Sequence, residues 1–238
     1  MTRFDRDSGE IWRNLFNELI GICLVPMIIL TDRISRRFMT TSEQRFEQAI
    51  SLLDAANAQD PNTTHWDSRS WPAELLYSVR MTHWLSHLEP NAGEALKLAV
   101  RAQHLCRWMI PRSQFPMNRA GYHQWRTTLA RFHADKAAEI VRDVGYDEPT
   151  IARVQSLIRK EKLKSDPEAQ TLEDVACLVF LEIDYVDFAT THEPQKVIAI
   201  LRKTWKKMSP RGHDAALELS HKLPEAQRRL IEQALQNA

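Results

Sequence analysis

Apolar positions along most of the chain recur three or four residues apart, which is the spacing of a helix face. In the segment 73–88, Leu75, Leu76, Val79 and Leu88 form one apolar stripe behind Pro72, a residue suited to the start of a helix. No segment alternates apolar and polar residues between Asn-Gly or Asp-Gly turns, so we expect no β-strand. The pattern predicts helices over 42–59, 73–88, 94–110, 119–144, 147–159, 168–189 and 195–208, with a last helix after Pro224.

The composition agrees with a helical protein. Only 6 of the 238 residues are glycine, so the chain has few of the tight turns on which hairpin-rich folds and glycine-rich phosphate loops depend. Hydrophobic residues make up 43% of the chain, enough for a packed core. We expect an all-α fold: a single-domain bundle of seven or eight helices over residues 39–238.

The first 38 residues differ from the rest. An apolar run over 19–30, interrupted by Pro26, is shorter than the roughly 20 residues that a membrane-spanning helix needs. Met39 is followed at once by a helix-capping sequence, Thr-Thr-Ser-Glu at 40–43. One interpretation is that residues 1–38 are an extension outside the fold and that Met39 is the true start. The other is an arm that adsorbs to a membrane or docks on a helix.

The three cysteines, Cys23, Cys106 and Cys177, are far apart and form no CxxC motif. This spacing indicates neither a disulfide framework nor a zinc knuckle. Together with the absence of a spanning segment, it predicts a protein of the reducing cytoplasm.

Charge is balanced overall but clustered locally. Lys and Arg number 32 against 31 Asp and Glu, giving a net charge of +1. Residues 101–131 nevertheless contain no acid, and 202–211 are basic as well, whereas acids gather over 166–187. The acid-free segment carries six arginines: Arg101, Arg107, Arg112, Arg119, Arg126 and Arg131. Because the guanidinium fork matches phosphate oxygens, these runs predict a phosphate-bearing ligand or a nucleic acid. A solvated surface, or ion pairs with the acidic segment, explains them equally simply.

Two histidines and an aspartate lie on inward stripes of three expected helices. His133 lies four residues after Leu129, His104 four after Val100, and Asp174 four before Leu178. Imidazole and carboxylate ligands suit Mn, Fe or Zn, so the three side chains could share a divalent ion. Alternatively, the histidines are hydrogen-bonded core residues and Asp174 pairs with a buried arginine.

The proposed ion site is similar to that of the HD-type helical metal phosphohydrolases, in which histidines on successive helices and a later aspartate hold the metal. The resemblance implies an HD/phosphodiesterase-like bundle with hydrolase activity. The chain departs from that pattern because His133-Ala134-Asp135 stands where the superfamily has an adjacent His-Asp pair.

A longer resemblance runs from Arg45 to about Leu217. It is carried by the strings AELLYSVRM, RAQHLCRWMIPR, FPMNRAGYHQWR, RFHADKAAEI, LKSDPEAQTLEDVACLVFLE and ILRKTWKKMSPRGH. These strings resemble an uncharacterised family catalogued as domain of unknown function 4202, some members of which carry a glutamyl-tRNA synthetase label. The label matches only the KMSPR string at 207–211, and the chain lacks the strands of a synthetase nucleotide-binding sheet, so we expect no synthetase activity.

Two hypotheses follow for function. The first is a divalent-metal-dependent hydrolase acting on a phosphate ester or nucleotide, with His104, His133 and Asp174 as metal ligands. In it, Glu173 or Glu74 serves as a further ligand or general base. The residues expected to hold substrate phosphate are Arg107, Arg112, Arg126, Lys160 and Lys164. The second is a non-catalytic helical module that binds RNA or another anionic partner through 101–131 and 202–211, with Trp108, Trp125 and Trp205 available for stacking.

Overall fold

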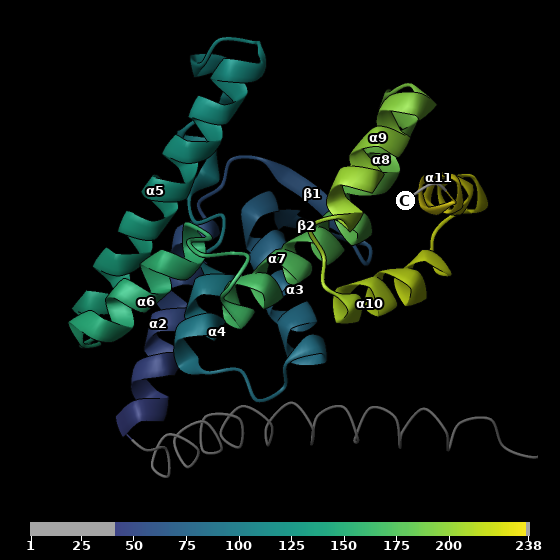
Figure 1. Cartoon of the computed structure of the whole chain (residues 1–238). Helices are drawn as coiled ribbons and strands as arrows, with labels where there is room; N and C mark the ends of the chain where they lie inside the picture. Colours follow the sequence, from purple (N-terminus) through teal and green to yellow (C-terminus); the bar gives the residue numbers. More distant parts are fainter. Residues whose placement is uncertain (1–40, 237–238) are drawn as a thin grey trace, which may run out of the picture. The chain divides into compact units, whose positions relative to one another are not determined.

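The computed structural model describes residues 41–236 (Figure 1). The backbone separates into two units, Met1–Glu47 and Gln48–Ala238, and the helices and strands from α3 onward lie in the second. The expectations for residues 1–38 and for Met39 lie outside the described residues. Among residues 41–236, no helix is both long and apolar enough to cross a membrane.

Within the described range the chain forms ten α-helices and one two-stranded sheet. The helices are α2 (Thr41–Asn57), α3 (Ala73–Leu88), α4 (Glu94–Arg101), α5 (Arg119–Asp143), α6 (Glu148–Ile158), α7 (Pro167–Val179), α8 (Tyr185–Thr191), α9 (Pro194–Trp205), α10 (Pro210–Ser220) and α11 (Glu225–Leu235). The all-α class is confirmed, and the helices outnumber the expected seven or eight.

Part of the excess comes from α10, which the sequence pattern did not separate from its surroundings. Ser209 and Pro210 begin this helix: the Ser209 side chain caps it by accepting the backbone N–H of Gly212 at 3.2 Å. The string at 207–211 that resembles a synthetase loop thus forms part of the connection after α9 and the start of α10.

The expected helix over 94–110 is wrong beyond Arg101. There α4 ends, and residues 102–106 form turns before a single 3-10 turn, η1 (Arg107–Met109). Cys106 has a φ of 53°, in the left-handed region that a right-handed helix does not accommodate. This turn gives His104 a direction that helical spacing did not predict.

The expected helix over 168–189 forms, but a π-helical segment interrupts its α-helical hydrogen bonding. A π-helical turn, η3 (Phe180–Asp184), joins α7 to α8. Asp166 caps the start of α7 by accepting the backbone N–H groups of Glu168 and Ala169. π-Helical turns occur frequently at functional sites, and this one carries Asp184 toward the site described below.

The expectation of no strand is wrong for one short hairpin, β1 (Thr63–Trp66) paired antiparallel with β2 (Arg69–Pro72). Asp67 and Ser68 connect the strands with φ values of 49° and 60°, as a two-residue turn with two left-handed positions requires. The sequence signal is weak because each strand has four residues and the turn contains no glycine.

The core lies where α3, α4, α5, α6 and α7 pack together. The helix α5 packs along α6, α4 packs on both α3 and α6, and α3 packs on α7 (Figure 1). Fully buried apolar side chains line these contacts, among them Leu76, Leu96, Leu157 and Leu172. This packing brings the first turn of α3, the turn after α4 and the middle of α5 to one place.

Candidate active site

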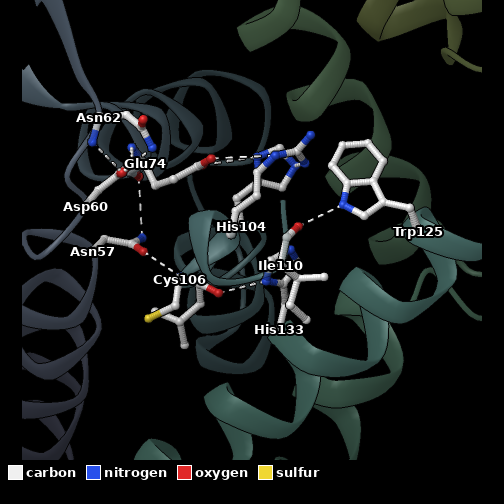
Figure 2. Close-up of polar contacts among 11 residues, drawn as sticks. Asn57, Asp60, Asn62, Glu74, His104, Cys106, Ile110, Trp125 and His133 are labelled. Carbon is white, nitrogen blue, oxygen red and sulfur yellow. Dashed lines mark hydrogen bonds and ion pairs between the residues drawn. The ribbon is translucent and has the colours of Figure 1, made fainter. Parts of the chain in front are cut away.

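A cluster of polar side chains, largely shielded from solvent, occupies that meeting point. Glu74 comes from the first turn of α3, His104 from the turn after α4, and His133 from the inward face of α5 (Figure 2). The rings of His104 and His133 have centroids 5.8 Å apart. The two imidazoles thus lie near each other, His133 from a helix as expected and His104 from a turn instead of the expected helix.

His133 has one bonded and one unbonded ring nitrogen. Its Nδ1 lies 2.7 Å from the carbonyl oxygen of Leu105, so Nδ1 carries the proton and donates (Figure 2). Nε2 is buried and has no hydrogen-bond partner among the described residues. Burial lowers the pKa of His133 to about 4, although the bond to Leu105 opposes this shift. At neutral pH the ring is neutral and its Nε2 lone pair is unused.

His104 is held on three sides. It stacks on Tyr77 with ring centroids 4.0 Å apart, its Nδ1 lies 3.4 Å from a Glu74 carboxylate oxygen, and its Nε2 lies 3.3 Å from Nη1 of Arg107. Because a guanidinium can only donate, Nε2 of His104 is the acceptor and Nδ1 carries the proton. Burial, followed by the charge of Arg107, lowers the pKa of His104 well below its ordinary value.

Glu74 is the carboxyl group of the cluster and has an unusual affinity for its proton. Burial raises the pKa of Glu74 to about 8; the Arg107 charge opposes the shift, and Asp60 and Asp184 add to it. Nε of Arg107 lies 3.6 Å from the Glu74 carboxylate. A carboxyl group that changes charge near neutral pH inside a polar cluster is typical of general acid–base sites.

A network of hydrogen bonds positions Glu74 and His104 (Figure 2). One carboxylate oxygen of Asp60 accepts the backbone N–H of Glu74 at 3.0 Å, which satisfies a free donor in the first turn of α3. The other accepts the backbone and side-chain N–H groups of Asn62. Asn57 accepts the N–H of Cys106 at 3.0 Å and donates to the carbonyl of Glu74 at 3.4 Å. These bonds join the start of α3 to the turn that carries His104.

Arg107 forms the solvent side of the cluster, with 25% of its side chain exposed. Its guanidinium lies over the ring of Trp125 at 4.9 Å, and the indole N–H of Trp125 donates to the carbonyl of Ile110 at 2.9 Å. Arg107 is therefore held by Glu74, His104 and Trp125 together, and its side chain is more exposed than those of Glu74 and His104.

Asp174 belongs to a different part of the fold. Its carboxylate accepts the backbone N–H of Ser209 at 2.8 Å, the Ser209 hydroxyl at 2.5 Å and the Gln170 amide at 3.0 Å. A Cβ on Gly212 would come within 2.8 Å of the same carboxylate. Asp174 faces inward as predicted, but it ties α7 to α10 instead of joining His104 and His133.

Glu173, the other acid expected to act in catalysis, is engaged by two lysines. It forms ion pairs with Lys160 and, at 3.4 Å, with Lys207. Burial by itself would raise the pKa of Glu173, but the two ammonium groups outweigh it and lower the pKa below its usual range. Glu74, named alongside it from the sequence, is the acid that lies beside the histidines.

The residues expected to hold phosphate are distributed over several positions. Arg112 donates to the carbonyls of Phe115, Pro116 and Asn118, and thus braces the segment before α5. Arg126 is exposed on α5, and Lys164 is exposed on the turn after α6. Only Arg107 contacts the cluster directly.

Within residues 41–236, no group of three or more His, Cys, Asp or Glu side chains is placed to hold a metal ion. In the arrangement described, both nitrogens of His104 face other groups, Glu74 and the cation Arg107. The residues present do not form the three-ligand set of a catalytic metal site, so no step below is derived through a metal. The divalent ion stays a prediction.

The sequence analysis missed Asn57, Asp60, Tyr77 and Asp184. Tyr77 follows Glu74 by three residues, so helical spacing places both on one face, and this signal could have identified it. Burial and then the nearby Glu74 charge raise the pKa of Tyr77 above its usual range. Asp184 has a pKa raised by burial, with Arg107 opposing. Its position depends on the π-helical turn, which has no clear sequence signature.

The fold and the cluster define an all-α protein with a buried carboxyl–imidazole site. The family model described as a domain of unknown function, DUF4202, matches residues 47–231, and the chain belongs to that family. No curated protein and no solved structure gives a significant match. The similarity to HD-type phosphohydrolases has no counterpart in these comparisons and stays a prediction.

Proposed function

We propose that the Glu74–His104–His133 cluster is the catalytic site of a hydrolase that acts on a phosphate ester or nucleotide. The single observation that carries this proposal is the unused, buried Nε2 lone pair of His133, in the same cluster as a carboxyl group with a pKa of about 8. An unsatisfied buried polar atom costs about 1–3 kcal/mol, and such a cost is typically retained where a ligand uses the atom.

The residues divide the work of hydrolysis between an acid and a base. A water molecule forms a bond to phosphorus and gives its proton to Nε2 of His133, while the ester P–O bond breaks. The leaving oxygen takes the proton of Glu74, which is mostly protonated at neutral pH because its pKa lies near 8. His104 lies between the two and orients Glu74 through Nδ1.

Arg107 supports phosphate as the substrate class. Its guanidinium is the one cation in contact with both Glu74 and His104 among the described residues, and it is partly exposed. Two parallel N–H groups on phosphoryl oxygens would offset the charge that develops in the transition state.

The alternative, a module that binds RNA through 101–131, has less support. Arg101 is buried and paired with Asp54 at 2.6 Å, and Arg107 and Arg112 are engaged internally. Trp125 is buried, and Trp205 already stacks on His213 at 3.7 Å. These three arginines and two tryptophans are engaged within the fold, which leaves fewer of the expected groups free to contact a nucleic acid strand.

The test is a hydrolysis screen with the full chain, using p-nitrophenyl phosphate, bis(p-nitrophenyl) phosphate and the common nucleotides, with and without added Mn²⁺. We expect turnover of at least one compound, reduced about 10²–10⁴-fold in His133→Asn and Glu74→Gln. His221→Ala, an exposed histidine at the end of α10, is the matched control and should keep full activity. Equal rates in all four proteins, each with its melting temperature intact, would overturn the proposal. Elemental analysis of the untagged protein separately tests the predicted metal.

A further inference from the structure

A hollow of about 390 Å³ opens beside the catalytic cluster, between the first half of α5 and the turn that follows α6. We name it the basic hollow, since most of the charged side chains that line it are cations. The lining includes Gln103 and four cations, Arg126, Arg131, Arg159 and Lys160. A volume of this size is in the range of small-molecule sites.

Of the four cations that line the basic hollow, two are paired with a carboxylate and two are not. Arg159 pairs with Glu161 at 2.8 Å, and Lys160 pairs with Glu173. Arg126 and Arg131 form no hydrogen bond or ion pair with another residue of the described part of the chain, and both are exposed on α5. Two unpaired guanidinium groups at one concavity repel each other, and a dianion between them would remove that repulsion.

Two further features indicate a ligand site. Gln103 is only 6% exposed, and its Oε1 is buried with no hydrogen-bond partner among the described residues. Lys160 has a φ of 55°, a left-handed conformation that costs a non-glycine residue about 1–2 kcal/mol. Unsatisfied buried groups and strained backbone of this kind cluster at ligand sites.

The hollow adjoins the cluster through two elements. Gln103 directly precedes His104, and Arg126 precedes His133 by seven residues, which is two helical turns along the same face of α5. Arg126 therefore lies about two helical turns, or roughly 11 Å along α5, from His133. After burial, Arg107 and His133, the charges of Arg126 and Lys160 also act on the pKa of His104.

We propose that the basic hollow binds the terminal phosphate or diphosphate group of a small molecule. This inference rests on the proposed function for the identity of the reacting bond, but the binding of the anion itself does not depend on it. Two unpaired arginines match the two charges of a phosphate monoester better than the single charge of a phosphodiester. The substrate class is thus a monoester or diphosphate held by Arg126 and Arg131.

The experiment is isothermal titration of the full chain, at constant ionic strength, with orthophosphate, pyrophosphate and dimethyl phosphate. We expect the first two to bind and the monoanionic diester to bind at least tenfold more weakly. Arg126→Gln and Arg131→Gln should each weaken pyrophosphate binding about tenfold or more. Arg119→Gln is the matched control, because Arg119 is an exposed arginine of the same helix outside the hollow.

Each result of these titrations either supports or overturns anion binding at the basic hollow. Equal binding by wild type, Arg126→Gln and Arg131→Gln, or no binding at all, would overturn the inference. A single-stranded RNA oligonucleotide that binds more tightly than pyrophosphate would also overturn it, if Arg119→Gln weakens RNA binding as much as Arg126→Gln and Arg131→Gln do. That result would indicate an extended surface for polyanions. If pyrophosphate binding depends on Arg126 and Arg131 but the screen shows no hydrolysis, anion binding at the basic hollow is supported. Only the proposed hydrolase function would then be contradicted.

Discussion

Asn57 Oδ1 accepts the backbone N–H of Cys106 at 3.0 Å, and this bond holds the left-handed turn that directs His104 into the cluster. The Nδ2 group of the same Asn57 reaches the carbonyl of Glu74. One buried amide at the end of α2 therefore sets two site residues relative to each other, although neither is near it in the sequence.

Replacing Asn57 should destabilise the protein and displace the cluster. Asn57→Ala leaves the buried N–H of Cys106 without a partner, which costs about 1–3 kcal/mol in the free energy of unfolding. Urea denaturation measures this change. Gln59→Ala, two residues away and exposed, should change the stability by less than about 0.5 kcal/mol. Equal stability of the two variants would show that the hydrogen bonds of Asn57 contribute nothing to the free energy of unfolding.

Glu74 should make the protein less stable as the pH rises. Its folded pKa of about 8 lies above the unfolded value near 4.5, so between these values the folded state holds a proton that the unfolded state has released. Wild type should lose stability relative to Glu74→Gln from about pH 4.5 to pH 8, at up to about 1.4 kcal/mol per pH unit. Denaturant titrations of both proteins between pH 6.5 and 8 measure the difference. Parallel curves would contradict the raised pKa.

His133 should make the protein less stable as the pH falls. Its folded pKa of about 4 lies below the unfolded value of 6.5, so between these values only the unfolded state binds the proton. Wild type should lose stability as the pH falls from 6.5 to 4. His133→Asn can still donate to the carbonyl of Leu105 but cannot titrate, so its stability should fall less over this range. A steeper fall in the variant than in wild type would rule out the buried neutral imidazole.

Asp174 should contribute to the stability of the protein and not to its hydrolytic activity. Asp174→Ala removes the acceptor of two hydrogen bonds from Ser209, at the start of α10, and of one from Gln170 within α7. We expect a loss of about 2–4 kcal/mol in the free energy of unfolding. Ser209→Ala, which removes only the hydroxyl, should cost about 1 kcal/mol. Neither variant should lower the hydrolysis rate per folded molecule. A stable Asp174→Ala protein that has lost bound metal and activity would instead restore the ligand set expected from the sequence.

How far the site could be predicted differs from residue to residue. His133 is on a long, regular helix, where a spacing of four residues from Leu129 is enough to place it inward, and it is 2% exposed. Asp174 is also inward, at 1% exposed, but periodicity carries no information about its partner. That partner, Ser209, comes from a helix start 35 residues further on.

Long strings of the sequence carry the family resemblance. Its local pattern predicts the helical class, most helix ranges and the inward faces of α5 and α7. These depend on the spacing of apolar residues and on caps, which act between near neighbours. The tertiary structure alone decided that Glu74 and not Asp174 lies beside the histidines, that Cys106 ends the continuation of α4, and that Arg126 and Arg131 meet Lys160 at one hollow. Each of these depends on contacts between distant segments, and on the burial that such contacts produce. Burial then sets the proton affinities of Glu74 and His133.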